Sequence, residues 1–135
     1  MITAVDTSVI LDILTASSDH LVASLDAFKK CREEGKLILC PIVWGELRPF
    51  FSSQDKMTAT IEKMSLGFDD FGKEAAARAG ELWQRYRKTK GSRLRILGDF
   101  MIGAHAQLKA DRLLTRDRGF YRDYFRGLKI IEPEK

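Results

Sequence analysis

Five short apolar segments alternate with longer stretches of helical periodicity along this chain, and that alternation constrains the fold more than any other feature. The predicted strands cover residues 2–5, 37–40, 66–71, 112–115 and 128–131. Helices are predicted between them, at residues 7–14, 20–34, 42–51, 56–64, 72–88 and 99–110. This pattern is typical of βαβ units, in which helices cover both faces of a parallel sheet. We therefore expect an α/β protein with three layers: helices, a central parallel β-sheet, and helices (α/β/α).

Length and composition limit the chain to one domain, which we expect to span residues 1–135. The chain is 44% hydrophobic and 31% charged, which suits a single globular core. No apolar run approaches the ~18 residues that a membrane span needs, and the N-terminus lacks the pattern of a secretory signal. We expect a cytoplasmic protein in which Cys31 and Cys40 are reduced thiols, with a disulfide as the alternative.

Four carboxylates end or interrupt apolar segments, and they are the candidates for a functional site. They are Asp6, Glu46, Asp99 and Asp117. In open parallel sheets, sites form outside the carboxyl ends of the strands. Asp6 directly follows the first predicted strand and Asp117 lies just beyond the fourth, so both are expected at that edge. If the four carboxylates meet, their repulsion requires a cation, and hard divalent cations prefer oxygen ligands.

Three of these carboxylates also have ordinary structural explanations. Asp6 and Asp99 open predicted helices, and aspartate is a favoured N-cap residue. Asp117 could be a turn residue or the partner of Arg116 or Arg118. The local sequence leaves both kinds of explanation open.

Glu46 is harder to explain as a structural residue. Val43, Leu47 and Phe50 form an apolar stripe at i, i+4, i+7 spacing on the predicted helix, and Glu46 lies beside this stripe. A carboxylate buried there without a partner is strongly disfavoured. Glu46 is therefore expected to have either a metal ion or a cationic partner such as Arg48.

Positive charge is concentrated in the second half of the chain. The net charge is +4, and residues 78–129 contain 14 Lys or Arg against 5 Asp or Glu. A basic surface around an acidic pocket suits a metal-dependent enzyme acting on a polyanion, and a solvated basic face is the alternative. Arg95, which ends a basic connector at residues 87–95, and Arg116 are candidates for contacting such a substrate. Asp12 and Asp123 are expected to be solvated surface residues.

The ordered motifs of the chain resemble those of one family. VDTSVILDIL, a Glu-Leu pair on a mid-chain helix, DFMIGAHA and LLTRDRGF resemble the motifs of PIN-domain ribonucleases, above all the VapC-type toxins of bacterial and archaeal toxin–antitoxin pairs. The resemblance covers residues 2–131. There are two departures: Gly103 stands in a stretch where the family commonly has Ile-Ala-Ala, and residues 40–43 lack the Ser or Thr often found before the glutamate.

The resemblance implies a PIN-like domain with one acidic pocket. Its predicted members are Asp6, Glu46, Asp99 and Asp117, which would bind Mg²⁺ or Mn²⁺. Ser8 and Thr115 match hydroxyl positions that support such a pocket. The family also implies a homodimer, and a cognate antitoxin whose C-terminal segment lies across the active-site groove.

From these features we expect a metal-dependent endoribonuclease that hydrolyses phosphodiester bonds in RNA, as the toxin of a type II toxin–antitoxin pair. The alternatives are a stand-alone PIN-domain nuclease and a non-catalytic module that binds RNA or a protein partner. A phosphatase of the dehalogenase-like type would need an aspartate two residues after Asp6, where this chain has Ser8. The sequence leaves open the RNA target and which carboxylates bind metal directly.

Overall fold

The computed structural model describes residues 1–16, 19–90 and 95–134, with the backbone alone at Lys90. Within these residues the chain alternates between strands and helices, as the sequence pattern predicts. The strands are β1 (Ile2–Val5), β2 (Lys36–Leu39), β3 (Leu66–Phe68), β4 (Arg112–Leu114) and β5 (Lys129–Ile131). The helices are α1 (Thr7–Leu14), α2 (Leu21–Glu34), α3 (Pro41–Leu47), α4 (Gln54–Lys63), α5 (Lys73–Lys90), α6 (Leu97–Lys109) and α7 (Arg118–Tyr124), and a short 3-10 helix covers Arg48–Phe50.

The five strands form one parallel sheet in the order β3-β2-β1-β4-β5. β1 lies at the centre, where Thr3 pairs with Leu37 of β2 on one side and with Arg112 of β4 on the other. The chain proceeds from β1 to one edge of the sheet and then crosses to β4 to build the other half. The carboxyl ends of β1 and β4 therefore flank the point where the strand order reverses, the place where open α/β sheets form their binding sites.

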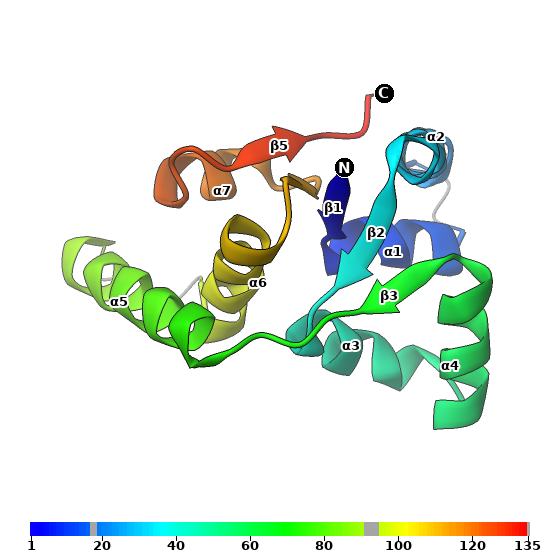
Figure 1. The fold of residues 1–135 in the computed structure, drawn as a ribbon, viewed down its shortest axis with the longest axis horizontal. Coiled ribbons are helices and arrows are strands. Elements are labelled where there is room, and N and C mark those ends of the chain that lie inside the picture. Colours follow the sequence, from blue (N-terminus) through cyan, green and yellow to red (C-terminus); the bar gives the residue numbers. More distant parts are fainter. Residues whose placement is uncertain (17–18, 91–94, 135) are drawn as a thin grey trace.

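Helices cover both faces of this sheet, which confirms the predicted α/β/α architecture. Connections between parallel strands of one sheet are right-handed. The helices that connect β1, β2 and β3 therefore lie on one face of the sheet, and those that connect β3, β4 and β5 lie on the other. Figure 1 shows α5, α6 and α7 grouped on one side of the strands and α1 to α4 on the other. The pairs α5–α6 and α1–α2 make the most extensive helix contacts.

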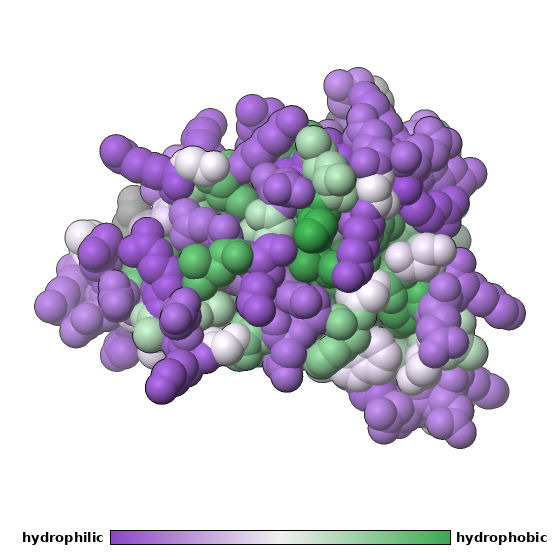
Figure 2. All heavy atoms as spheres, viewed as in Figure 1, coloured by the Kyte–Doolittle hydropathy of each residue, from purple (hydrophilic) through white to green (hydrophobic). Residues whose placement is uncertain are grey.

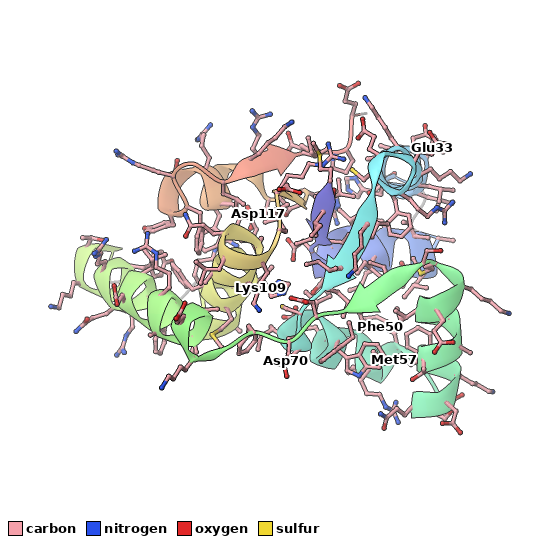
Figure 3. All side chains as sticks on the ribbon, in the orientation of Figure 1. Glu33, Phe50, Met57, Asp70, Lys109 and Asp117 are labelled. Carbon is pink, nitrogen blue, oxygen red and sulfur yellow. The ribbon has the colours of Figure 1, made fainter. Side chains whose placement is uncertain are left out.

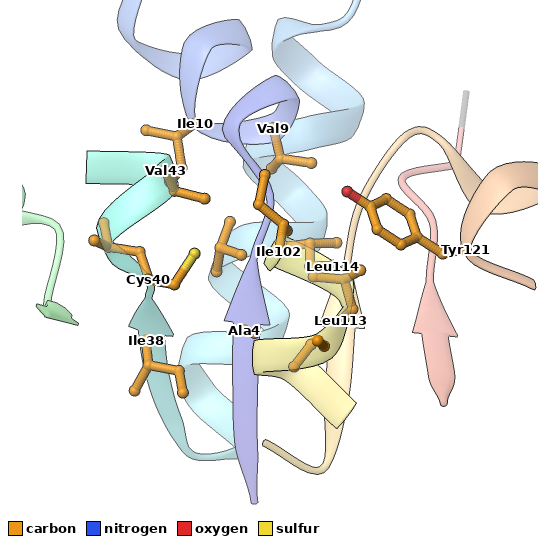
Figure 4. Packing of buried hydrophobic residues seen from close by; sticks show 14 of the residues in the cluster. Ala4, Val9, Ile10, Ile38, Cys40, Val43, Ile102, Leu113, Leu114 and Tyr121 are labelled. Atoms are coloured by element: carbon orange, nitrogen blue, oxygen red, sulfur yellow. The ribbon is translucent and has the colours of Figure 1, made fainter. Parts of the chain in front are cut away.

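The core is built from the strands and the helix faces that cover them. Ala4 on β1, Ile38 on β2 and Leu113 on β4 are almost fully buried, and Figure 4 shows them side by side on neighbouring strands. Val9 of α1 and Val43 of α3 pack near the strand ends. Burying an aliphatic side chain of this kind contributes about 1.5–3 kcal/mol to folding. The face of the molecule shown in Figure 2 is largely hydrophilic, and charged side chains such as Glu33 on α2 point away from the body in Figure 3.

Helix α7 is the element that the sequence pattern did not predict. Its aromatic side chains pack on Phe100 of α6, with ring centroids 5.1 Å away at Phe120 and 5.5 Å away at Tyr124. A helix of seven residues is unstable alone and depends on such tertiary contacts.

Two predicted elements extended too far, while the ends of the others lie within two residues of their predicted positions. The third helix was predicted to residue 51, yet α3 ends at Leu47, because Pro49 cannot donate a backbone hydrogen bond in a continuing helix. β3 was predicted to residue 71 but ends at Phe68, because its partner β2 ends at Leu39, the residue that pairs with Phe68.

Gly103 has a packing explanation. A Cβ atom at this position in α6 would lie 2.3 Å from Cε2 of Phe125, whose ring is fully buried. The departure from the family motif therefore makes room for an aromatic ring.

Both cysteines, Cys31 and Cys40, are buried free thiols, as predicted. None of the helices in the described ranges combines the length and apolar character that a bilayer span requires.

Candidate active site

The four predicted carboxylates line one open pocket of about 510 Å³. The pocket lies at the carboxyl ends of β1 and β4, where the strand order reverses. We call it the acidic pocket and define it by Asp6, Glu46, Asp99 and Asp117. Its other lining residues are Thr7, Ser8, Leu11, Ile102 and Arg116. The fold thus brings together carboxylates from the residue after β1, from α3 and α6, and from the turn after β4.

Asp6 is the most deeply placed of the four, at 7% exposure. One carboxylate oxygen accepts the backbone N–H of Thr7 at 2.8 Å, and the other accepts the hydroxyl of Thr115 at 2.6 Å. The pKa of Asp6 is raised from 3.8 to about 6. Burial is the largest cause, the two hydrogen bonds oppose it, and the negative charges of Glu46 and Asp117 add to the rise. An ionised Asp6 therefore has an unfavourable environment that a cation would improve.

Thr115 links two members of the acidic pocket, Asp6 and Asp117. It is fully buried, its hydroxyl donates to Asp6, and its Oγ1 accepts the backbone N–H of Asp117 at 3.0 Å. This one hydroxyl group therefore fixes the carboxylate that follows β1 relative to the backbone of the residue that follows β4. The contact fits the supporting position expected for Thr115.

Glu46 reaches the acidic pocket from the surface rather than from the core. The prediction of a buried Glu46 is wrong, because its side chain is exposed. Phe50, the last residue of the predicted apolar stripe, lies beyond the end of α3 at Leu47 and is 55% exposed, so the stripe is shorter than predicted. Its Oε1 accepts the hydroxyl of Thr7 at 2.6 Å. Arg48, the predicted salt-bridge partner, instead donates to the carbonyl oxygen of Phe51.

Asp99 is half-buried in the first turn of α6. Its Oδ2 accepts the backbone N–H of Ile96 at 3.1 Å and so caps the helix. Asp6 is the N-cap residue of α1. The N-cap prediction is therefore correct for Asp6 and wrong for Asp99, because α6 begins two residues earlier than predicted and its N-cap is Ile96. Asp99 is the third residue of α6 and binds the backbone of the N-cap residue instead.

Asp117, labelled in Figure 3, forms an ion pair with Arg95. The predicted partners, Arg116 and Arg118, are not involved. The guanidinium of Arg95 also lies 4.3 Å from the ring centre of Phe120, a cation–π contact that holds it in place. Arg95 thus neutralises one carboxylate of the acidic pocket.

Asp12 is buried, so the prediction of a solvated surface residue is wrong. Its Oδ2 lies 2.7 Å from Nε of Arg116 and accepts the hydroxyl of Ser24 at 2.6 Å. The cause is tertiary, because α1 packs against α2 and covers this part of the helix. Asp123, by contrast, is exposed as predicted and lies beside Arg122.

The lining residues fit a hard divalent cation in their chemistry. All four acidic side chains offer oxygen, and the Oγ atom of Ser8 is buried in the pocket wall without a hydrogen-bond partner in the described part of the chain. Among the described residues, no three acidic, imidazole or thiol groups converge into a ready coordination sphere. Glu46 and Asp117 each use one carboxylate oxygen to bind a protein donor, Thr7 and Arg95 respectively, which leaves the second oxygen of each side chain available to an ion.

Two residues near the acidic pocket were not identified from the sequence. Thr7 binds Glu46, and its position directly after Asp6 was the available signal. Tyr121 of α7 is 2% exposed, and Figure 4 shows its hydroxyl pointing toward the carboxyl ends of the strands. Burial raises the pKa of Tyr121 well above its ordinary value, and the charges of Asp6 and the other carboxylates add to this. Tyr121 therefore remains a neutral phenol.

The basic connector is only partly described. Arg87 belongs to α5, where its guanidinium lies 4.8 Å from the ring centre of Trp83, and Lys88 is exposed on the same helix. Arg93 and the side chain of Lys90 lie outside the described residues.

A PIN-domain family model matches residues 3–125, so this chain belongs to the PIN-domain family. No curated protein matches the chain.

Several solved structures share its fold. VapBC2 from Rickettsia felis, bound to a DNA fragment from its promoter, is 18% identical with a TM-score of 0.71 over 99% of this chain and 100% of that chain. VapBC-1 from nontypeable Haemophilus influenzae is 19% identical with a TM-score of 0.70 over 98% of each chain. Mycobacterium tuberculosis VapC20, described as a toxin that cleaves the sarcin-ricin loop, is 15% identical with a TM-score of 0.58 over 82% and 86%.

Proposed function

We propose that this protein is a metal-dependent endoribonuclease that hydrolyses phosphodiester bonds in RNA. The observation that supports the proposal most directly is the acidic pocket, in which four carboxylates gather at the switch point of the sheet. Membership of the PIN-domain family and the fold shared with an RNA-cleaving toxin point in the same direction. The basic sequence around the pocket suits a polyanionic substrate.

Asp6, Glu46, Asp99 and Asp117 would hold one or two Mg²⁺ or Mn²⁺ ions, with Asp6 and Asp99 as the first candidates for direct ligands. Such an ion, when bound, supplies a water activated for attack and charge stabilisation at the phosphate. The chain itself orients the carboxylates: Thr115 fixes Asp6, and Thr7 holds Glu46. Ser8 offers a further hydroxyl group in the pocket wall.

The test is cleavage of RNA by purified protein with Mg²⁺ or Mn²⁺, with EDTA, and with Asp6→Asn or Asp99→Asn. We expect cleavage by the wild-type chain only with the ion, and a loss of about 100-fold or more in either variant. Asp123→Asn, which changes an exposed aspartate, is the matched control and should cleave at the wild-type rate.

A soluble Asp6→Asn or Asp99→Asn variant that cleaves RNA at the wild-type rate would contradict the assignment. RNA binding without metal-dependent cleavage would instead favour a non-catalytic RNA-binding module. Hydrolysis of a small phosphate ester in place of RNA would indicate a phosphatase.

We further propose that the chain acts as the toxin of a type II pair, as a single PIN domain that forms a homodimer in the cytoplasm and is neutralised by an antitoxin protein. The solved structures with this fold include VapBC and FitAB assemblies. Growth arrest on expression of the wild-type chain but not of Asp99→Asn, relieved by a neighbouring gene product, is the expected result. Cleavage of RNA without growth arrest would favour a stand-alone PIN-domain nuclease.

A further inference from the structure

Arg116 lines the acidic pocket, and a buried aspartate fixes its position. Asp12 makes a two-point contact with the guanidinium: Nε of Arg116 lies 2.7 Å from Oδ2, and one terminal nitrogen, Nη2, lies 3.1 Å from Oδ1. Asp12 is 4% exposed, and its Oδ2 also accepts the hydroxyl of Ser24. A planar, two-point pair with a buried carboxylate leaves the guanidinium little freedom.

The contact with Asp12 leaves part of the guanidinium available. A guanidinium has five N–H donors, and Asp12 occupies one on Nε and one on Nη2. The N–H groups of Nη1 make no hydrogen bond to any residue that the structure describes. The Arg116 side chain is 35% exposed, so these donors can be reached from solvent.

The side chain of Arg116 also lines two pockets. Besides the acidic pocket, it lines a neighbouring pocket of about 610 Å³. The other residues of this second pocket are His20, Ala23, Arg118, Glu132, Pro133 and Glu134. The side chain of Arg116 can therefore be reached from both pockets.

We propose that Asp12 is a positioning residue that holds Arg116 so that its remaining N–H donors bind an RNA phosphate beside the acidic pocket. The inference rests on the proposed ribonuclease function and adds a residue that the metal chemistry does not require. A cluster of carboxylates repels a polyanion, and a cation fixed at its rim offsets that repulsion. Because Asp12 orders the side chain before RNA arrives, binding costs less rotamer entropy. Arg95 is less suited to the role because its partner, Asp117, is itself one of the proposed metal ligands.

The test is a double-mutant cycle on binding of a short single-stranded RNA, with every variant carrying Asp99→Asn to block cleavage. Arg116→Ala and Asp12→Asn should each weaken the affinity by about three- to tenfold. Because Asp12 acts through Arg116, the double variant should bind no more weakly than Arg116→Ala alone. Arg116→Ala should also reduce the slope of log affinity against log salt by about one. Asp123→Asn, an exposed aspartate that also lies beside an arginine, is the matched control and should leave the affinity unchanged.

In the cleavage assay without the Asp99 change, Asp12→Asn should raise KM more than it lowers kcat. A loss of structure would not produce this split, and thermal unfolding of each variant checks the fold. Should Asp12→Asn fail to fold, Arg116→Lys carries the test: lysine keeps the charge but cannot make the two-point contact, so affinity should fall toward that of Arg116→Ala.

The proposal is overturned if the two effects multiply in the double variant, or if Arg116→Lys binds RNA as tightly as the wild-type chain. Unchanged affinity in all variants of a chain that does cleave RNA overturns this inference alone. A wild-type chain that neither binds nor cleaves RNA overturns the proposed function together with it.

Discussion

At the scale of single residues, Asp6 shows how a functional position can oppose stability. Its carboxylate is buried, and burial together with two neighbouring negative charges raises its pKa from 3.8 to about 6. A shift of this size corresponds to about 3 kcal/mol of lost stability at neutral pH, since one pKa unit is worth about 1.4 kcal/mol. Because the pKa of Asp6 is higher in the folded chain than in the unfolded chain, this loss of stability is full above about pH 6 and absent below pH 3.8.

We therefore predict that Asp6→Asn raises the Tm of the metal-free protein at neutral pH, although it removes a proposed ligand. The amide has the same shape without the charge, so the repulsion within the acidic pocket falls. Thermal unfolding in EDTA measures the effect. Addition of Mg²⁺ should raise the Tm of the wild-type chain and leave that of the variant nearly unchanged, whereas an Asp6→Asn variant less stable than wild type in EDTA would refute the prediction.

His105 predicts a pH dependence elsewhere in the molecule. It is 1% exposed, and its Nε2 lies 2.8 Å from Oδ2 of Asp69. Burial lowers the pKa of His105 below its usual 6.5, outweighing the opposite effect of Asp69. Because the unfolded chain then binds the proton more readily, stability is full above pH 6.5 and falls as the pH drops below it.

The Tm of the wild-type chain should therefore fall between pH 7.5 and pH 5 more steeply than that of His105→Gln. Thermal unfolding over this range measures the difference, and His20→Gln, which changes the other of the two histidines, is the matched control. Equal pH slopes for wild type and His105→Gln would exclude His105 as the source.

At the scale of elements, two helical glycines predict opposite outcomes for the same substitution. Gly103→Ala in α6 would bring a methyl group to 2.3 Å from the buried ring of Phe125, whereas Gly80→Ala in α5 meets nothing within 4 Å. The first should cost about 1–3 kcal/mol through overpacking, and the second should add about 0.5–1 kcal/mol through helix propensity. Chemical denaturation measures both, and Phe125→Leu should partly rescue Gly103→Ala. Equal effects at the two positions would contradict this account.

The elements also show what local sequence can predict. The alternation of apolar runs and helical periodicity gave five strands and six helices, because side-chain periodicity follows directly from local geometry. It did not predict α7, which depends on contacts with Phe100, nor the end of β3, which depends on where the paired strand β2 ends. Both failures have the same cause: the deciding contact lies in another element.

At the scale of the whole molecule, the charge distribution predicts how the protein binds RNA. If the exposed basic residues of α5 contact phosphates, neutralising them should weaken binding uniformly across sequences. Arg87→Gln with Lys88→Gln should reduce the slope of log affinity against log salt by about two. Lys29→Gln with Arg32→Gln, on the helix α2 that covers the other half of the sheet, is the matched control and should leave the slope unchanged. A slope that falls equally in both pairs would indicate diffuse attraction rather than a defined contact.

The candidate site was partly predictable from the sequence, because the positions of the strands can be predicted from local periodicity. Asp6 and Asp117 follow strands, so a parallel sheet alone puts them at one edge, and the family motifs added Glu46 and Asp99. The burial assigned to Glu46 and the solvation assigned to Asp12 were both wrong. In each case the burial of a side chain was inferred from the pattern of its own helix. Burial depends instead on which neighbouring elements pack against that helix.

The sequence by itself therefore determined the class of fold, the edge of the sheet that carries the acidic side chains, and the family. Only the tertiary structure decided which charges pair: Arg95 with Asp117, and Arg116 with Asp12, a residue 104 positions away in the chain. The physical reason is that periodicity records which face of an element is apolar. The burial and partners of a charged group depend on which faces meet, and here that meeting follows from the order β3-β2-β1-β4-β5.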